Sequence, residues 1–168
     1  MRAKILVIGT DNETLVEIVA KKLISKKYTI AVSESCTGGL LSKRLTDIPG
    51  SSKYIKLNVV TYSNDSKNKI LNIPPEIIKK YGAVSHECAK YMALGIKNLA
   101  KSDIGFSVTG IAGPAGATKE KPVGLVYFGF AKRNSVKTKK IYFGSNSSRS
   151  EIRWLAAQYA LNWIRKEL

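Results

Sequence analysis

The segment SESCTGG, residues 33–39, places three hydroxyl side chains and one thiol directly after the strand-like run YTIAV. A hydroxyl or thiol between a strand and a helix is suited to acyl transfer, because backbone amides at the helix start can stabilise an oxyanion. Ser35 is one candidate nucleophile and Cys36 is the rival, since a thiolate is the stronger nucleophile. Serine and threonine also cap helices, so the segment alone leaves both roles open.

A serine nucleophile needs a base, and His86 is the only histidine in the chain. A Ser-His-Asp triad is therefore possible only through His86, and the zinc motif His-Glu-x-x-His is excluded. A neutral lysine is also a competent base when burial lowers its pKa. Lys67 is the candidate, because it lies on a short predicted helix after a strand that reaches Tyr62.

A glycine-rich loop, TGIAGPAGATKEKPVG, begins at Thr109 and Gly110, directly after a buried-looking strand. It lacks the Gly-Lys-Ser/Thr ending of a Walker A loop. Arg149, in the first turn of the last predicted helix, adds a guanidinium to free amides, which favours phosphate binding. Ligands of open α/β sheets bind at the carboxyl ends of strands, so we expect this loop to meet residues 33–39 and the segment after Tyr62.

Helical spacing and cap residues predict six helices, and three of them position the candidate residues. The helix that opens at Thr37, the short helix capped by Ser63 or Asn64, and the last helix carry these residues. The last helix begins with a capping box of Ser148 and Glu151. The predicted helices run over about residues 12–24, 37–47 and 85–100, over two short stretches that begin at Ser63 or Asn64 and at the Pro74-Pro75 pair, and from about Arg149 through Ile164.

Five runs rich in β-branched and aromatic residues predict strands. They span about residues 28–32, 54–63, 103–110, 123–131 and 137–144, and the last two are expected to form an antiparallel hairpin. The run at 54–63 becomes more apolar toward its end, which favours a strand entering the middle of the sheet. Helices interleaved with strands predict a single three-layer α/β/α domain with a mixed, mostly parallel sheet of about five strands.

The length of 168 residues suits one domain over residues 1–168, with residues 1–11 as an N-terminal extension or a strand. No apolar run reaches the ~20 residues that cross a bilayer, and the N-terminus does not resemble a signal peptide. We therefore expect a cytoplasmic protein without membrane contact. Its two cysteines, Cys36 and Cys88, are expected to be reduced thiols.

The formal net charge is +16, but the lysines are spread over the whole chain. A basic arm or an aromatic-basic motif would indicate nucleic-acid binding, and neither is present. The charge therefore favours a solvated lysine-rich surface, and nucleic acid is not the expected partner.

Seven motifs resemble, in order, those of the CinA carboxy-terminal domain, or nicotinamide mononucleotide amidohydrolase (deamidase), family. They are ESCTGG, LTDIPGSS, VVTYSNDSK, GAVS, VTGIAGPAG, EKPVG and RSEIR, and they cover the chain from about residue 28 to its end. Longer members of the family also carry an amino-terminal molybdopterin-binding-like domain. The motifs match the carboxy-terminal module alone, so the resemblance implies a stand-alone form. The chain departs from the family at Ala117, usually a glycine, and at Ser148, commonly an aspartate.

The resemblance implies hydrolysis of the carboxamide of nicotinamide mononucleotide to nicotinate mononucleotide and ammonia, in pyridine-nucleotide recycling. It implies neither a metal nor another cofactor. The family's catalytic serine, tyrosine and lysine fall on Ser35, Tyr62 and Lys67. Substrate contacts are expected at Cys36, Thr37, Gly38, Gly39, Thr109, Gly110 and, for the phosphate, Arg149.

On this hypothesis, neutral Lys67 takes the proton of Ser35, Tyr62 relays or orients that proton, and amides at the start of the Thr37–Gly39 helix hold the oxyanion. Two alternatives remain: a non-catalytic module that binds a nucleotide or sugar phosphate, and a DNA-associated competence or damage-inducible protein. A homo-oligomer is compatible with each of them.

Overall fold

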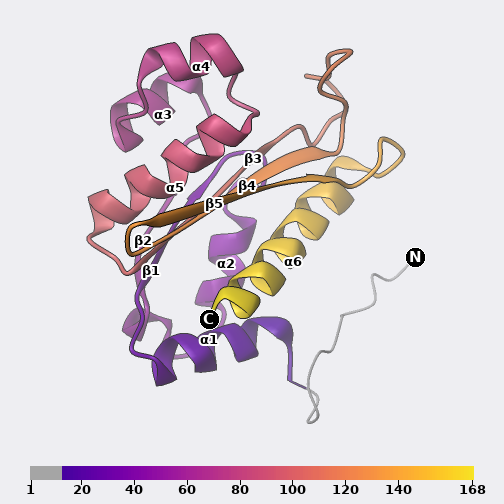
Figure 1. The fold of residues 1–168 in the computed structure, drawn as a ribbon. Coiled ribbons are helices and arrows are strands. Elements are labelled where there is room, and N and C mark those ends of the chain that lie inside the picture. The colour runs from indigo at the N-terminus through magenta and orange to yellow at the C-terminus, as the bar shows by residue number, and fades with distance from the viewer. Residues whose placement is uncertain (1–12) are drawn as a thin grey trace.

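The computed structural model describes residues 13–168, and this part of the chain forms a five-stranded sheet with helices on both faces (Figure 1). The strand order is β2-β1-β3-β4-β5. The strands are β1 (Ile30–Glu34), β2 (Ile55–Val60), β3 (Ile104–Gly110), β4 (Leu125–Lys132) and β5 (Ser135–Tyr142). The helices are α1 (Leu15–Ser25), α2 (Leu40–Thr46), α3 (Asn64–Leu71), α4 (Pro75–Tyr81), α5 (His86–Ala100) and α6 (Arg149–Glu167), with a 3-10 turn at Ser51–Lys53.

Two apolar cores fill the space between the three layers. The larger core joins the sheet to α1, α2 and α6, and the smaller core joins it to α3, α4 and α5. Figure 1 shows these two helix groups on opposite sides of the strands. The prediction of a single α/β/α domain with a mixed sheet is confirmed.

Parallel and antiparallel strand pairs are equal in number, whereas the sequence predicted a mostly parallel sheet. β1 runs parallel to β2 and to β3, and β4 runs antiparallel to β3 and to β5. Residues 111–124 form a loop without a helix, so the chain turns back beside β3 instead of crossing over to a parallel position. The predicted hairpin of β4 and β5 is confirmed.

The prediction that the strand at 54–63 enters the middle of the sheet is wrong. β2 lies at one edge of the sheet, next to β1 only. Its side chains are half-buried or exposed, and Val60 is 45% exposed. The rise in apolar content toward the end of this strand instead brings Val59 against the smaller core.

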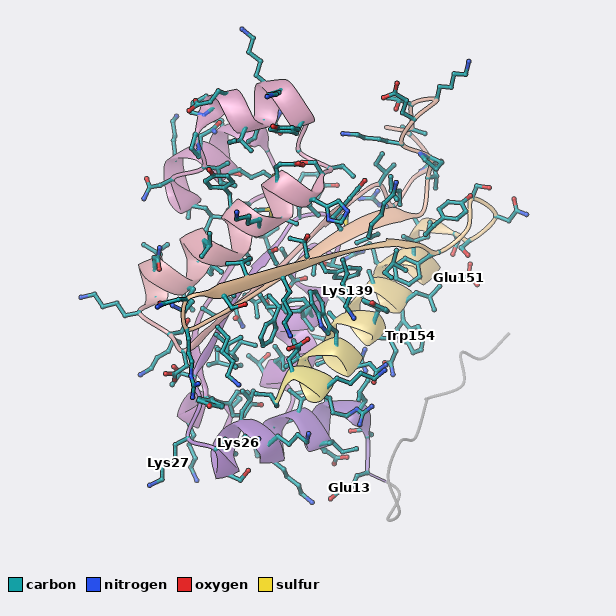
Figure 2. The ribbon with its side chains drawn as sticks, viewed as in Figure 1. Glu13, Lys26, Lys27, Lys139, Glu151 and Trp154 are labelled. Atoms are coloured by element: carbon teal, nitrogen blue, oxygen red, sulfur yellow. The ribbon has the colours of Figure 1, made fainter. Side chains whose placement is uncertain are left out.

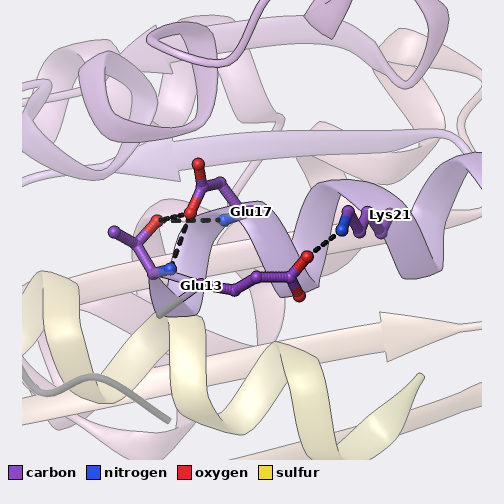
Figure 3. A network of polar contacts seen from close by, with 4 residues as sticks. Glu13, Glu17 and Lys21 are labelled. Carbon is purple, nitrogen blue, oxygen red and sulfur yellow. Dashed lines mark hydrogen bonds and ion pairs between the residues drawn. The ribbon is translucent and has the colours of Figure 1, made fainter. Parts of the chain in front are cut away.

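The start of α1 differs from the sequence prediction. Thr14 caps the helix: its hydroxyl accepts from the Glu17 amide, and the Glu17 carboxylate accepts from the Thr14 amide (Figure 3). Glu13 forms an ion pair with Lys21 beside this capping box. The predicted cap, Asn12, and the predicted extension or strand over residues 1–11 lie outside the described residues.

The last helix agrees with the sequence prediction both in its capping box and in its buried face. Ser148 and Glu151 form the capping box at its start, where Figure 2 labels Glu151. The predicted apolar face packs into the larger core, with Ile152 and Trp163 at most 2% exposed.

Two strand glycines let α5 lie unusually close to the sheet. A Cβ atom at Gly105 on β3 would be 2.1 Å from the Ala93 carbonyl oxygen of α5. A Cβ atom at Gly129 on β4 would be 2.3 Å from the Ala89 carbonyl oxygen. Any larger side chain at either position must push α5 outward, and α5 packs against β1, β3 and β4.

We therefore expect Gly105→Ala to lower the free energy of unfolding by about 1–3 kcal/mol, because the added methyl overpacks the sheet–helix contact. Urea unfolding followed by circular dichroism measures this change. Ser135→Ala, at an exposed position of β5, is the control and should change the midpoint little. Equal stability of Gly105→Ala and the wild type would show that α5 is free to shift.

Candidate active site

The candidate site lies at the point of the sheet where the direction in which the chain adds new strands reverses. From β1 the chain adds β2 on one side and then β3 on the other side, and the helices after β1 and β2 pack on opposite faces of the sheet. Such a switch point opens a crevice at the carboxyl ends of the strands. Ser35 follows β1, and Thr109 and Gly110 end β3.

Ser35 and Lys67 come together in this crevice. Lys67 Nζ lies 3.2 Å from Ser35 Oγ. It also donates to the carbonyl oxygens of Thr61, at 2.8 Å, and Tyr62, at 3.2 Å. Ser63 caps α3 through the Ser66 amide and thus starts the helix one turn before Lys67. The short connection from β2 to α3 therefore folds the amine back toward the end of β1.

Lys67 is 1% exposed, although it is a lysine. Burial lowers its pKa, because loss of water destabilises the ammonium form. Within the described residues no carboxylate forms an ion pair with it. The conditions for a neutral lysine base are therefore present around Lys67.

Glu34, the last residue of β1, is a buried carboxylate that the sequence analysis did not single out. Its oxygens accept from the amides of Gly39 (3.1 Å), Leu41 (3.2 Å) and Ser42 (2.7 Å), and from the Ser42 hydroxyl (2.5 Å). Glu34 thus occupies the amino-terminal end of α2, where an anion is stabilised by free amides and the helix dipole.

This contact changes the expectation for residues 37–39. The Gly39 amide binds Glu34, and the Gly38 amide donates to the Ser35 carbonyl oxygen at 3.1 Å. Thr37 is fully buried, and none of the three residues lines the cavity beside Ser35. The amides at the start of α2 are therefore committed within the protein, and the structure gives no support for a direct substrate contact by Thr37, Gly38 or Gly39.

A cavity of about 210 Å³ opens beside Ser35. The sequence-predicted residues that line it are Ser35, Cys36, Tyr62, Lys67, Thr109, Gly110 and Arg149. The other lining residues come from the loop before α5, at Ala83 and Val84, and from the loop after β3, at positions 111–113, 115 and 116. The three loops that the sequence predicted to meet do meet here.

Tyr62 and Arg149 form the exposed side of this cavity. The Tyr62 side chain is 59% exposed, and its hydroxyl accepts from Arg149 Nη2 at 2.9 Å. Arg149 Nη1 donates to the Gly113 carbonyl oxygen at 2.7 Å. The phenol thus contacts the arginine, while the Tyr62 backbone carbonyl contacts Lys67. Within residues 13–168 no hydrogen bond joins the phenol to Ser35 or Lys67, so its predicted proton relay lacks a direct path in this structure.

Thr109 and Gly110 form the base of the cavity by different means. The buried Thr109 hydroxyl donates to the Ala83 carbonyl oxygen at 2.8 Å, which fixes the loop before α5. A Cβ atom at Gly110 would be 2.7 Å from the Leu125 carbonyl oxygen, so this position has no room for a side chain. Both residues shape the cavity wall.

Cys36 lines the cavity but is 5% exposed and belongs to the larger core. Burial, with a smaller contribution from the Glu34 carboxylate, raises the pKa of its thiol to about 12. A thiol of this kind carries almost no thiolate at neutral pH, which weighs against Cys36 as the nucleophile.

His86 lies away from Ser35. It begins α5, its Nδ1 is 2.8 Å from the Thr138 hydroxyl, and its ring packs edge-on against Tyr127. It is not among the residues that line the cavity. The structure therefore does not assemble a Ser-His-Asp triad around Ser35.

Arg153 is a second residue that the sequence analysis missed, although it lies within the RSEIR motif. Its Nε and Nη2 donate to the Thr37 carbonyl oxygen at 3.1 and 2.9 Å. It follows Arg149 by one helical turn, so both side chains lie on the same face of α6. The spacing could have shown from the sequence that Arg153 lies beside Arg149, but it could not show which loop Arg153 contacts.

Basic side chains lie on the surface of several elements, and some of them gather at the β4–β5 turn. Four ion pairs occur among residues 13–168, and each contains a lysine that is more than half exposed. Figure 2 labels Lys26 and Lys27 after α1 and Lys139 on β5. A larger open depression of about 660 Å³ lies at the β4–β5 turn, lined by Lys132, Arg133, Lys137 and other residues. It contains no serine–lysine pair like that of Ser35 and Lys67.

Residues 13–168 contain neither a cluster of metal ligands nor a helix that could span a membrane. No group of three or more His, Cys, Asp or Glu side chains is placed to hold a metal ion. No helix combines the length and apolar character needed to cross a membrane.

Comparison with known proteins gives consistent matches. The family model described as the CinA C-terminal domain matches residues 12–168. A protein of Alkaliphilus metalliredigens named for competence and damage induction is 51% identical over 162 residues, which are 96% of this chain and 39% of that protein. A CinA-like protein of Endomicrobium trichonymphae is 48% identical over 162 residues, with 37% of its length covered. The chain thus spans less than two-fifths of these relatives.

Solved structures match over nearly their whole length. The competence damage-inducible protein A from Klebsiella pneumoniae superposes with a TM-score of 0.87 at 32% identity, covering 90% of this chain and 93% of that chain. A competence/damage inducible protein from Agrobacterium tumefaciens gives 0.84 at 36% identity, covering 90% and 94%.

The Cys36 environment predicts a slow thiol. We expect Cys36 to react with iodoacetamide at pH 8 at least ~100-fold more slowly than a free cysteine, because it is buried and its pKa is raised. Peptide mass spectrometry of the native protein measures the rate, and the urea-unfolded protein is the control. Fast labelling at neutral pH would instead identify Cys36 as an activated nucleophile.

The lowered pKa of Lys67 predicts a pH-dependent cost in stability. Between the pKa of folded Lys67 and the unfolded value near 10.5, the unfolded chain binds more protons, so stability rises with pH. Lys67→Met removes this titration. Its advantage over the wild type in free energy of unfolding should therefore be largest below the folded pKa and should decrease as pH rises toward 10.5.

Urea unfolding across this pH range measures that difference. The matched control is Lys69→Met, on the same helix at an exposed position, and it is measured at the same pH values. A difference between Lys67→Met and the wild type that stays constant with pH would contradict the lowered pKa.

Proposed function

The chain belongs to the CinA C-terminal domain family, and from this membership and the Ser35–Lys67 pair we propose that it hydrolyses the carboxamide of nicotinamide mononucleotide. The products are nicotinate mononucleotide and ammonia. One observation carries the proposal: a buried lysine amine, which forms no ion pair with a carboxylate of residues 13–168, lies 3.2 Å from a serine hydroxyl inside a cavity. Such a pair is suited to nucleophilic attack on an amide.

The three contacts of Lys67 can be made by a neutral amine as well as by an ammonium group, and burial favours the neutral form. A neutral amine has two N–H donors and one lone pair. The carbonyl oxygens of Thr61 and Tyr62 can take both donors. In that form the lone pair is left for Ser35, whose hydroxyl can turn to donate to it, whereas an ammonium Nζ donates to all three oxygens. The backbone around Lys67 thus orients the base as well as burying it.

The reaction then follows in two halves. Ser35 Oγ attacks the carboxamide carbon as its proton passes to Lys67 Nζ, and this gives a tetrahedral oxyanion. Lys67 returns the proton to the amide nitrogen, the C–N bond breaks, and ammonia leaves an acyl-enzyme. Water attacks the ester with Lys67 as base, the Ser35–acyl bond breaks, and the serine regains its proton.

The oxyanion needs donors other than the amides that bind Glu34. The Cys36 amide follows the nucleophile directly, and within residues 13–168 its one acceptor is the thiol of its own side chain, not another residue. In many hydrolases this position supplies an oxyanion donor. We therefore assign the oxyanion to the Cys36 amide in place of the Gly39 amide.

The phosphate end of the substrate fits Arg149. Its guanidinium lies at the exposed side of the cavity, in the first turn of α6, and its contacts are to Gly113 and Tyr62 rather than to a carboxylate. A phosphate can exchange for these neutral partners and gain a charge-assisted bond. The cavity of about 210 Å³ then holds the reacting end of the nucleotide near Ser35.

The decisive experiment is the release of ammonia and nicotinate mononucleotide by the purified chain. We expect Ser35→Ala and Lys67→Met each to lower kcat by several orders of magnitude, because the pair acts as a unit. Lys69→Met is the matched control for Lys67→Met and should keep wild-type turnover.

Near-wild-type turnover of Ser35→Ala would exclude the serine mechanism. Tight binding of nicotinamide mononucleotide without turnover would instead indicate a non-catalytic binding module.

A further inference from the structure

One face of α6 contacts all three loops of the site. Arg149 binds Tyr62 after β2 and Gly113 after β3. Arg153, one turn later, binds Thr37 after β1. The proposed function uses Arg149 for phosphate and leaves Arg153 without a role.

The Arg153 contact is specific in geometry. Two nitrogens of one guanidinium, Nε at 3.1 Å and Nη2 at 2.9 Å, converge on a single carbonyl oxygen. The contact is partly buried and joins residues 116 positions apart in the chain. Hydrogen bonds from a charged donor are stronger than those between neutral groups, and the planar guanidinium fixes their direction.

The segment beneath Arg153 is shaped to admit it. Gly38 has φ +59°, and a Cβ atom there would be 3.2 Å from Arg153 Nη2. The Gly38 amide in turn donates to the Ser35 carbonyl oxygen. A compact turn of residues 35–38 is thus held by Arg153 from outside and by its own hydrogen bond from inside.

We propose that Arg153 is a positioning residue that fixes the turn of residues 35–38 and so directs Ser35 Oγ toward Lys67. It does so without touching the substrate. Lys67 is held independently by the carbonyls of the β2–α3 connection, so the separation of nucleophile and base depends on where the Ser35 turn lies. This role rests on the proposed function, because it assigns a purpose to the Ser35–Lys67 geometry.

The proposal predicts that kcat is affected and KM is not. A displacement of about 1 Å in a reacting group can reduce the rate ~100-fold. Arg153→Met should therefore lower kcat by about 10–100-fold and change KM for nicotinamide mononucleotide less than ~3-fold. Arg153→Lys keeps a cation and one flexible donor, and its kcat should lie between those of Arg153→Met and the wild type.

Gly38→Ala tests the same turn from the other side. Its methyl presses on Arg153 Nη2, and its backbone conformation disfavours a side chain, so kcat should fall with little change in KM. Arg165→Met is the matched control on α6, because the hydrogen bonds of the Arg165 guanidinium within the described part of the chain go to the Asn162 side chain of the same helix. It should keep wild-type kcat.

Hydrogen exchange gives a readout that needs no substrate. Peptides that contain residues 35–39 should exchange faster in folded Arg153→Met than in the wild type, while peptides from β3 and β4 should be unchanged. Thermal unfolding identifies any variant that fails to fold, and Arg153→Lys then takes its place in the comparison.

The outcomes separate the two proposals. If the wild-type chain releases no ammonia, the proposed function fails, and exchange alone decides whether Arg153 holds the turn. If the wild type is active, an Arg153→Met enzyme with unchanged kcat overturns the positioning role. Unchanged exchange at residues 35–39 also overturns it, whatever the activity.

Discussion

The site depends on an amine that is buried without an opposite charge beside it. Burying the ammonium form of Lys67 without such a partner is unfavourable, and the fold accommodates the side chain by favouring the neutral form. Two backbone carbonyls, at Thr61 and Tyr62, provide hydrogen bonds without adding a full negative charge. The β2–α3 connection therefore buries the amine, which destabilises its ammonium form, and it also orients the amine toward Ser35.

The second constraint on the site is the carboxylate of Glu34, the residue before Ser35. A carboxylate close to Lys67 would favour the ammonium form and raise the lysine pKa. The Glu34 carboxylate instead accepts three amides and a hydroxyl at the start of α2. Each of the two ionisable groups is bound by backbone groups and one serine hydroxyl, and the two are not paired with each other. The same contact fixes α2 directly after the nucleophile, so the helix start acts as a support.

The sequence was informative where local chemistry decides the structure. Helical spacing with a capping box identified α6, and β-branched runs separated by turn residues identified the strands. The position of β2 could not be found this way, because an apolar strand end has the same pattern at the edge of a sheet as in its middle. The direction of β4 depends on whether residues 111–124 form a crossover helix. The glycine and proline residues of this segment indicate a loop, but they do not show on their own that the chain returns beside β3.

The candidate site shows the same limit more sharply. The family motifs identified Ser35 and Lys67 as candidates, but no local sequence pattern shows that Lys67 Nζ and Ser35 Oγ lie 3.2 Å apart. Glu34 stood in the ESCTGG motif and Arg153 in the RSEIR motif, and each acts through backbone groups of another segment. A backbone carbonyl or amide is present at every residue, so sequence cannot mark which one is bound. Residues that act on backbone are therefore the part of a site that needs a structure, even when every side chain involved lies in a recognised motif.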